Sequence, residues 1–270
     1  MHGMDRSAWR PDRRANLLNA FRITLEESGP GHRLDVHTAQ DIVEQLVALR
    51  GPAYTEGRSR HTDWTHELVS PHPVDPSVLR LLHLLSRVLT VHRPRHLTLA
   101  LDWYKQPAES GKLVNTEVGD LVSRAKYRWA DPQEIIECGR ALTDSLVGVI
   151  QQHPLLATTD VVISVPGHDC DQVAFSQRLG ASVAAALSVD HVRVGTVHAQ
   201  RPEAKALTSE QRSRLADEFT IDRDLHGLHG IVIDDVYRSG DTIAGVARAA
   251  RRAGAEWLAG LVCARTLRTS

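Results

Sequence analysis

The sequence contains few cysteines and almost no net charge, and both shortages exclude kinds of protein. Its three cysteines, Cys138, Cys170 and Cys263, are too scattered for a zinc knuckle and odd in number for a disulfide framework. We therefore expect a reducing, cytoplasmic environment. The 32 basic and 33 acidic residues give a formal net charge of −1, so no overall basic field indicates nucleic acid as a partner.

Long apolar runs are also missing. No stretch approaches the ~18 uninterrupted apolar residues that a membrane-spanning helix needs. Residues 1–16 contain four arginines but lack the apolar segment of a signal peptide. We therefore expect neither membrane insertion nor secretion. What is present is 42% hydrophobic residues in a chain of 270, which is enough for a packed core and typical of about two domains.

The first hundred residues look like a module of their own, which we predict to be mostly helical. Apolar residues recur at helical spacing in residues 38–50 and again in residues 75–89. Asp75 and Pro76 are a favourable N-cap and first-turn pair for the second helix. Residues 53–73 contain three histidines and read as an irregular excursion without recurring metal-ligand spacing. Residues 1–100 are therefore predicted as one module, to which the sequence assigns no role.

Residues 101–270 alternate between strands and helices, which predicts an α/β fold with a parallel sheet flanked by helices. In such a sheet the ligand site lies at the carboxyl ends of the strands. We expect strands at residues 97–104, 161–165, 191–198, 231–233 and 257–264, and helices at residues 132–152, 173–187 and 242–253.

One stretch, residues 230–245, carries the strongest functional signal. A strand of branched apolar residues leads into Asp234 and Asp235, and a short loop at residues 238–242 leads into a helix. The loop offers backbone N–H groups, two hydroxyls and a glycine at a helix N-terminus, an arrangement that holds phosphate. The acids would then meet a sugar hydroxyl or a metal ion. A plainer alternative is a strand edge with one capping acid and one solvated acid.

Two better-known phosphate motifs do not account for the acid pair. A Rossmann turn needs three glycines, and a Walker loop needs Gly-Lys-Ser/Thr. The stretch instead resembles the phosphoribosyl-pyrophosphate (PRPP) motif of the type I phosphoribosyltransferases, with the match at residues 231–242. It departs from that motif at Gly230, Tyr237 and Arg238, where the family has an apolar, an aliphatic and a small residue.

The resemblance implies a role for each residue of the motif. Asp234 and Asp235 would bind the ribose hydroxyls, directly or through Mg²⁺, whose preferred ligands are oxygens. Asp241 would assist catalysis near the sugar carbon, through its charge or as a base. The implied loop for the ribose 5-phosphate consists of Arg238, Ser239, Gly240, Asp241 and Thr242.

Further segments resemble, in order, the ComF-type (competence protein F) branch of this family, over about residues 104–266. By this resemblance Pro166, Gly167 and His168 would contact pyrophosphate. Lys126, Arg128 and Arg212 would close over the phosphates, and their alternative role is that of ordinary surface charges. The matching segments are residues 121–128, 163–166, 175–177, 207–219 and 261–265.

The chain also departs from the ComF pattern. The family's zinc ribbon is absent, so residues 1–100 cannot inherit its role. The pyrophosphate loop is arginine-rich in the family, whereas here it contains Asp169 and Asp171, with His168 as the candidate cation. Cys170 could act as a nucleophile beside His168, but no paired motif supports this. Fewer residues of the sequence therefore support catalytic turnover than support the fold.

Three functions are predicted, in this order. The first is a phosphoribosyltransferase that binds PRPP or a phosphoribosyl nucleotide with Mg²⁺ and uses an acceptor that the sequence does not identify. The second is a non-catalytic regulator that senses the same ligands and signals through residues 1–100. The third is a nucleic-acid accessory protein, which the near-neutral charge argues against.

In this fold a variable hood covers the acceptor, and we expect residues 1–100 to form it. For the oligomeric state, the sequence leaves a homodimer as the candidate to test.

Overall fold

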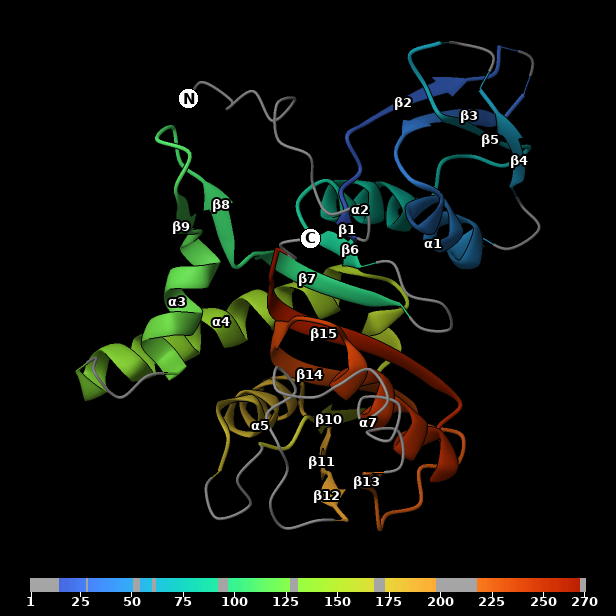
Figure 1. The fold of residues 1–270 in the computed structure, drawn as a ribbon. Helices are drawn as coiled ribbons and strands as arrows, with labels where there is room; N and C mark the ends of the chain where they lie inside the picture. The colour runs from blue at the N-terminus through green and yellow to red at the C-terminus, as the bar shows by residue number, and fades with distance from the viewer. Residues whose placement is uncertain are drawn as a thin grey trace.

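The structure of the protein, a computed structural model, shows a large mixed sheet, a small antiparallel sheet and the helices that cover them (Figure 1). The described residues contain no helix long and apolar enough to span a membrane. They are residues 15–27, 29–50, 54–59, 62–91, 97–126, 131–167, 173–197 and 218–267.

Seven strands form the large sheet, in the order β1-β6-β7-β15-β14-β10-β11. The last five in this order are parallel to one another, whereas β1 and β6 are antiparallel additions at one edge. This arrangement confirms the predicted α/β fold with a parallel sheet. The strands are β1 (Ala15–Asn16), β6 (Leu89–Val91), β7 (Thr98–Trp103), β15 (Trp257–Arg265), β14 (His229–Tyr237), β10 (Val161–Ser164) and β11 (Asp190–Arg193).

Helices cover both faces of the parallel strands, which explains why those strands read as continuous apolar runs. Ile231 and Ile233 of β14 belong to a core shared with α4 (Pro132–Gln152) and α5 (Phe175–Leu187). Val232 belongs to a second core, on the face covered by α7 (Asp241–Arg252). The predicted helices at 132–152 and 242–253 are confirmed to within a residue or so. Residues 118–127, for which we predicted no element, largely form α3 (Glu117–Lys126).

The N-terminal module is less helical than predicted. Its helices α1 (Gln40–Arg50) and α2 (Pro76–Leu85) occur as expected, and the Asp75 carboxylate accepts a hydrogen bond of 2.7 Å from the Ser77 N–H. Between and before them lies a four-stranded antiparallel sheet in the order β2-β3-β5-β4, so the prediction of a mostly helical module was wrong. Its strands are β2 (Ala20–Leu25), β3 (His32–His37), β5 (His66–Ser70) and β4 (Thr55–Arg58).

Buried polar side chains explain why the sequence did not reveal this small sheet. In the six-residue strand β3 only Leu34 and Val36 are apolar, and the almost completely buried His32 and Asp35 are polar, so the apolar signal of this strand is short. His32 Nε2 lies 2.9 Å from Tyr54 Oη, and Arg22 donates a 2.7 Å hydrogen bond to Asp35. These pairs give partners to groups that would otherwise be costly to bury, whereas Asp35 Oδ1 has no hydrogen-bond partner among the described residues.

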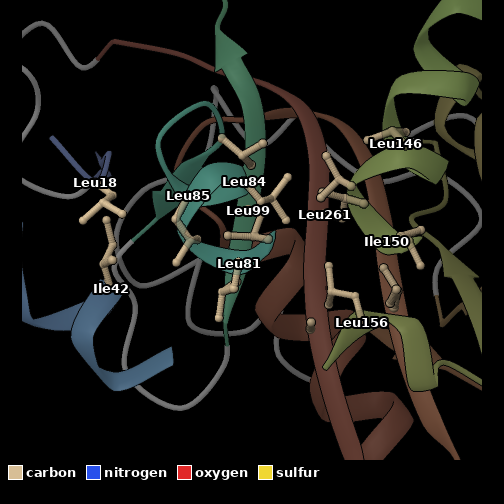
Figure 2. Packing of buried hydrophobic residues seen from close by; sticks show 14 of the residues in the cluster. Leu18, Ile42, Leu81, Leu84, Leu85, Leu99, Leu146, Ile150, Leu156 and Leu261 are labelled. Carbon is tan, nitrogen blue, oxygen red and sulfur yellow. The ribbon is translucent and has the colours of Figure 1, made fainter. Parts of the chain in front are cut away.

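One core joins the small sheet to the large one. Leu18 and Ile42 of the N-terminal module lie beside the leucines of α2, and these reach Leu99 of β7 and Leu261 of β15 (Figure 2). The described part of the chain is completed by two short antiparallel pairs and one 3₁₀ turn. These are β8 (Lys105–Pro107) with β9 (Leu113–Asn115), β12 (Gly195–Thr196) with β13 (Phe219–Thr220), and the turn Leu156–Thr158.

A buried histidine ties α1 to the end of α4. His153 Nε2 lies 3.3 Å from Gln45 Oε1, and Gln45 donates a 3.0 Å hydrogen bond to the Thr90 hydroxyl of β6. The Leu155 N–H donates to His153 Nδ1 at 3.3 Å, so this nitrogen acts as an acceptor and the ring is neutral. Burial lowers the pKa of His153 to about 4.

Because the pKa of His153 is lowered in the folded protein, we predict that the free energy of unfolding decreases in mild acid. Between about pH 6.5 and pH 4 the unfolded chain takes up a proton that folded His153 does not, so stability falls as the pH drops through this window. By linkage, His153 alone should lower the free energy of unfolding by about 2 kcal/mol between pH 7 and pH 5. Urea unfolding at the two pH values measures this loss, and His153→Gln should reduce it. An unchanged pH dependence in the variant would contradict the assignment.

Candidate functional site

Two neighbouring carboxylates lie near the carboxyl end of the central strand. We predicted that the strand covers residues 231–233 and that Asp234 and Asp235 follow it, but β14 continues to Tyr237. The prediction was too short because the two acids interrupt the apolar run, whereas the backbone ladder does not end there. Asp234 pairs with Val262 of β15 in this ladder. The strand therefore fixes both carboxylates at the sheet edge where α/β proteins bind ligands.

A lysine neutralises the second acid. Lys126, the last residue of α3, places its ammonium Nζ 2.6 Å from Asp235 Oδ2. Asp235 is buried, with only 8% of its surface exposed, and its Oδ1 accepts a 2.8 Å hydrogen bond from the Val236 N–H. A buried carboxylate needs such partners, because its desolvation is costly.

The first acid is in a less favourable electrostatic position. Burial and the adjacent charge of Asp235 raise the pKa of Asp234 well above its usual range, and Lys126 offsets this in part. Its Oδ1 accepts a 2.9 Å hydrogen bond from the Asp235 N–H. Two close carboxylates with one cation leave excess negative charge, which favours a ligand that brings hydroxyl donors or a metal ion.

The buried cysteine on the next strand does not supply a nucleophile. Cys263 is free, lies within β15 and is fully buried. Burial, followed by the charges of Asp235 and Asp234, raises the pKa of its thiol well above the usual value. Because the thiolate is the reactive form, Cys263 is chemically inert here.

The loop after the strand turns sharply into α7. Gly240 forms the N-cap of α7 with φ of 75°, a left-handed conformation that glycine adopts without strain. A Cβ at this position would lie 2.1 Å from the hydroxyl oxygen of Tyr237. The tyrosine ring is thus packed directly under the loop, which accounts for the departure from the aliphatic residue of the PRPP motif.

A buried arginine supports the same loop from β15. Arg265 is 1% exposed and lies over the Tyr237 ring, with 5.0 Å between its guanidinium carbon and the ring centroid. Its Nη1 donates hydrogen bonds of 2.6 Å to the carbonyl of Arg238 and 2.8 Å to that of Thr266. The Arg238 carbonyl of the loop is thereby directed toward Arg265.

The acid pair, Lys126 and the loop before α7 line one pocket of about 540 Å³. Of the predicted residues, it brings together Lys126, the acid pair, Arg238, Ser239, Gly240 and Thr242. The pocket combines a helix N-terminus, which favours anions, with carboxylates that favour cations or hydroxyl donors. Such a pocket suits a ligand with a phosphate at one end and a polyhydroxylated group at the other.

Other predicted residues lie beside the pocket or outside the described chain. Asp241 begins α7 but is not among the described lining residues. Pro166 and Gly167 follow β10, the neighbour of β14, so they reach the same sheet edge. The structure leaves their predicted contact with pyrophosphate untested. His168, Arg128 and Arg212 lie outside the described residues, so their predicted roles remain predictions.

The sequence reading missed one wall of the pocket. This wall consists of Tyr104, which lies between β7 and β8, Lys105 and Leu113 of the β8–β9 hairpin, and Val122 of α3. No described residue before Tyr104 lines the pocket, so in the described chain this hairpin, and not the N-terminal module, lies beside the acids. No motif marks these residues, because their position follows from chain packing alone. Arg265 ends the segment 261–265 that resembles the ComF pattern, but the sequence assigned it no role.

No protein-family model matches the sequence, and no curated protein matches it. The chain is similar to a solved structure of adenine phosphoribosyltransferase from Leishmania tarentolae, with a TM-score of 0.39 and 15% identity over 63% of this chain and 91% of that one. For the adenine phosphoribosyltransferase from Saccharomyces cerevisiae the TM-score is 0.37 and the identity 17%, over 60% of this chain and 82% of that one. For orotate phosphoribosyltransferase from Aeropyrum pernix the TM-score is 0.32 and the identity 19%, over 58% of this chain and 71% of that one. Likeness at this level establishes neither a shared substrate nor a shared activity.

The loop conformation predicts opposite effects of alanine at two glycines. Gly240→Ala places a side chain at positive φ and against the Tyr237 ring, so it should lower the free energy of unfolding by about 2 kcal/mol or more. Gly139→Ala, within α4 and with no atom near the new Cβ, should raise it by about 0.5–1 kcal/mol. Urea unfolding measures both changes. Equal effects of the two substitutions would contradict the proposed fit of the loop.

Arg265 should be needed for the stability of the loop. Arg265→Met removes the donor to the Arg238 carbonyl of the loop and to the Thr266 carbonyl, and should cost about 2–4 kcal/mol in the free energy of unfolding. The control is Arg248→Met at an exposed position of α7, which should change stability by about 0.5 kcal/mol or less. Thermal unfolding of the two variants distinguishes them, and a neutral Arg265→Met would show that the carbonyls find other donors.

Proposed function

We propose that this chain binds PRPP or a phosphoribosyl nucleotide and transfers the phosphoribosyl group to an acceptor. The observation that carries the proposal is the single pocket shared by the acid pair, Lys126 and the loop at the start of α7. Each part matches one part of the ligand by charge. The resemblance of residues 231–242 to the PRPP motif supports the same assignment.

The 5-phosphate would bind at the loop before α7. The first N–H groups of a helix have no acceptor within that helix, and the helix dipole favours a negative charge in front of them. Ser239 and Thr242 place hydroxyl groups at the same position in the pocket. Gly240 lets the backbone approach the phosphate closely, and Tyr237 with Arg265 holds the loop from below.

The acid pair fits both the ribose and Mg²⁺. Carboxylate oxygens accept hydrogen bonds from sugar hydroxyls, and Mg²⁺ commonly binds through one or two carboxylates together with substrate phosphates. Two adjacent carboxylates that share one ammonium form an environment in which a divalent cation is favourable. When bound through Asp234 and Asp235, Mg²⁺ would neutralise charge on the pyrophosphate group.

In the proposed reaction the bond between the anomeric carbon and pyrophosphate breaks as the acceptor nucleophile bonds to that carbon. The electron pair of the broken bond leaves with pyrophosphate, and the acceptor gives up a proton if it carries one. The transition state has cation-like character at the sugar, so positioning and charge dominate catalysis. Asp234 and Asp235 would hold the ribose, and Asp241 remains the proposed source of charge or base near the sugar carbon.

The acceptor would lie against the β8–β9 wall. Tyr104, Leu113 and Val122 provide apolar surface in the pocket that contains the acid pair. Such a surface suits a flat, partly apolar acceptor such as a nucleobase. The hairpin thus takes the role of a hood that we had predicted for residues 1–100.

A non-catalytic sensor is the second candidate. The segment predicted to bind pyrophosphate contains two acids, which is unfavourable for a polyanion. A regulator would use the same pocket but release no pyrophosphate. Incubation of the protein with PRPP, Mg²⁺ and a panel of nucleobases, followed by a pyrophosphate assay, decides between the two functions, because release above background excludes the sensor.

Binding itself should depend on the acid pair. Titration calorimetry with PRPP in MgCl₂ should show binding by the wild type, and Asp234→Asn and Asp235→Asn should each weaken it by roughly 10-fold to 100-fold, because each loses charge-assisted hydrogen bonds. Asp222→Asn, at an exposed position outside the pocket, is the matched control and should bind normally. Absence of binding by the wild type would rule out the proposed function.

A further inference from the structure

The lysine on Asp235 is held in place by the way α3 is anchored. The Thr116 hydroxyl accepts a 3.0 Å hydrogen bond from the Gly119 N–H, and it donates to the Trp103 carbonyl at the end of β7. A Cβ on Gly119 would lie 1.9 Å from the Tyr104 carbonyl oxygen, so helix and strand touch directly. The helix therefore starts at the carboxyl end of β7, and its last residue, Lys126, reaches across to β14.

The ammonium occupies a position that a metal ion would also need. Lys126 Nζ is 2.6 Å from Asp235 Oδ2, while Oδ1 of the same carboxylate is engaged by the Val236 N–H at 2.8 Å. Both oxygens of Asp235 thus have a donor in the ligand-free protein. A divalent cation bound to Oδ2 would have to displace the ammonium, because two cations cannot share one oxygen at contact distance without strong repulsion.

We infer that Lys126 is a resident counter-cation that controls entry of a divalent cation to Asp235. In the free protein it holds the acid pair and keeps metal affinity low. When a phosphate-bearing ligand enters, its negative charge draws the half-exposed ammonium away from Asp235, and the freed carboxylate becomes available to Mg²⁺. This inference rests on the proposed function and adds an order of binding to it.

Thermodynamic linkage makes binding of the divalent cation and of the phosphate-bearing ligand cooperative. If the phosphate ligand raises the affinity for the cation by some factor, the cation raises the affinity for the phosphate ligand by the same factor. Removal of the lysine charge should therefore have two separable effects. The metal should bind better by itself, and the gain in metal affinity caused by the phosphate ligand should shrink.

The first experiment measures MgCl₂ binding without any sugar phosphate. Titration calorimetry should show at least about 10-fold tighter Mg²⁺ binding to Lys126→Met than to the wild type, which corresponds to about 1.4 kcal/mol. Lys126→Arg retains the cation and should behave as the wild type. Lys112→Met removes an exposed lysine that is not among the described lining residues of the pocket, and it should leave Mg²⁺ affinity unchanged. Circular dichroism confirms that each variant is folded.

The second experiment measures coupling with ribose 5-phosphate as the probe. In the wild type, saturating ribose 5-phosphate should tighten Mg²⁺ binding several-fold, and in Lys126→Met this factor should approach one. Unchanged or weaker Mg²⁺ binding by Lys126→Met alone would overturn the inference, as would equal coupling in both proteins. Failure of the wild type to bind PRPP rules out the proposed function and is distinguishable, because the first experiment contains no sugar phosphate.

Discussion

The site depends on the placement of two carboxylates side by side near the end of a strand that is buried on both faces. Asp234 and Asp235 cannot be hydrated there as they would be on a surface, so their charge has to be balanced by protein groups or by a ligand. Lys126 balances part of it through a 2.6 Å ion pair to Asp235. Burial, followed by the adjacent charge of Asp235, raises the pKa of Asp234. The acid pair makes this end of the sheet attractive to hydroxyl donors and cations.

The phosphate side of the pocket is built by packing rather than by charge alone. The loop before α7 is shaped by Gly240 at positive φ, by the Tyr237 ring beneath it, and by the Arg265 guanidinium that binds the Arg238 carbonyl. Because Arg265 is almost fully buried, it supports the loop and does not meet the ligand. The same loop can therefore present backbone N–H groups to an anion while Arg265 holds the Arg238 carbonyl.

The N-terminal module takes part in the structure in a way that its sequence did not suggest. It contributes β1 and β6 to the edge of the large sheet, and its helices share one hydrophobic core with β7 and β15. The buried contact of His153 with Gln45 adds a polar link between the module and α4. This integration stabilises the edge next to β7, from which the β8–β9 hairpin and α3 continue to the pocket.

The sequence by itself determined the alternating strands and helices, the acid pair of β14 and the glycine-containing loop, because these follow from local patterns of apolar, charged and turn-forming residues. It did not reveal the small sheet, since β3 has only two apolar residues and buries the polar side chains of His32 and Asp35. Only the tertiary structure decided that Lys126 meets Asp235, that Arg265 lies under the loop, and that Tyr104 and Leu113 wall the pocket. These contacts join residues more than 25 positions apart along the chain, or depend on which sheet edge a helix reaches, and no local pattern encodes such distances.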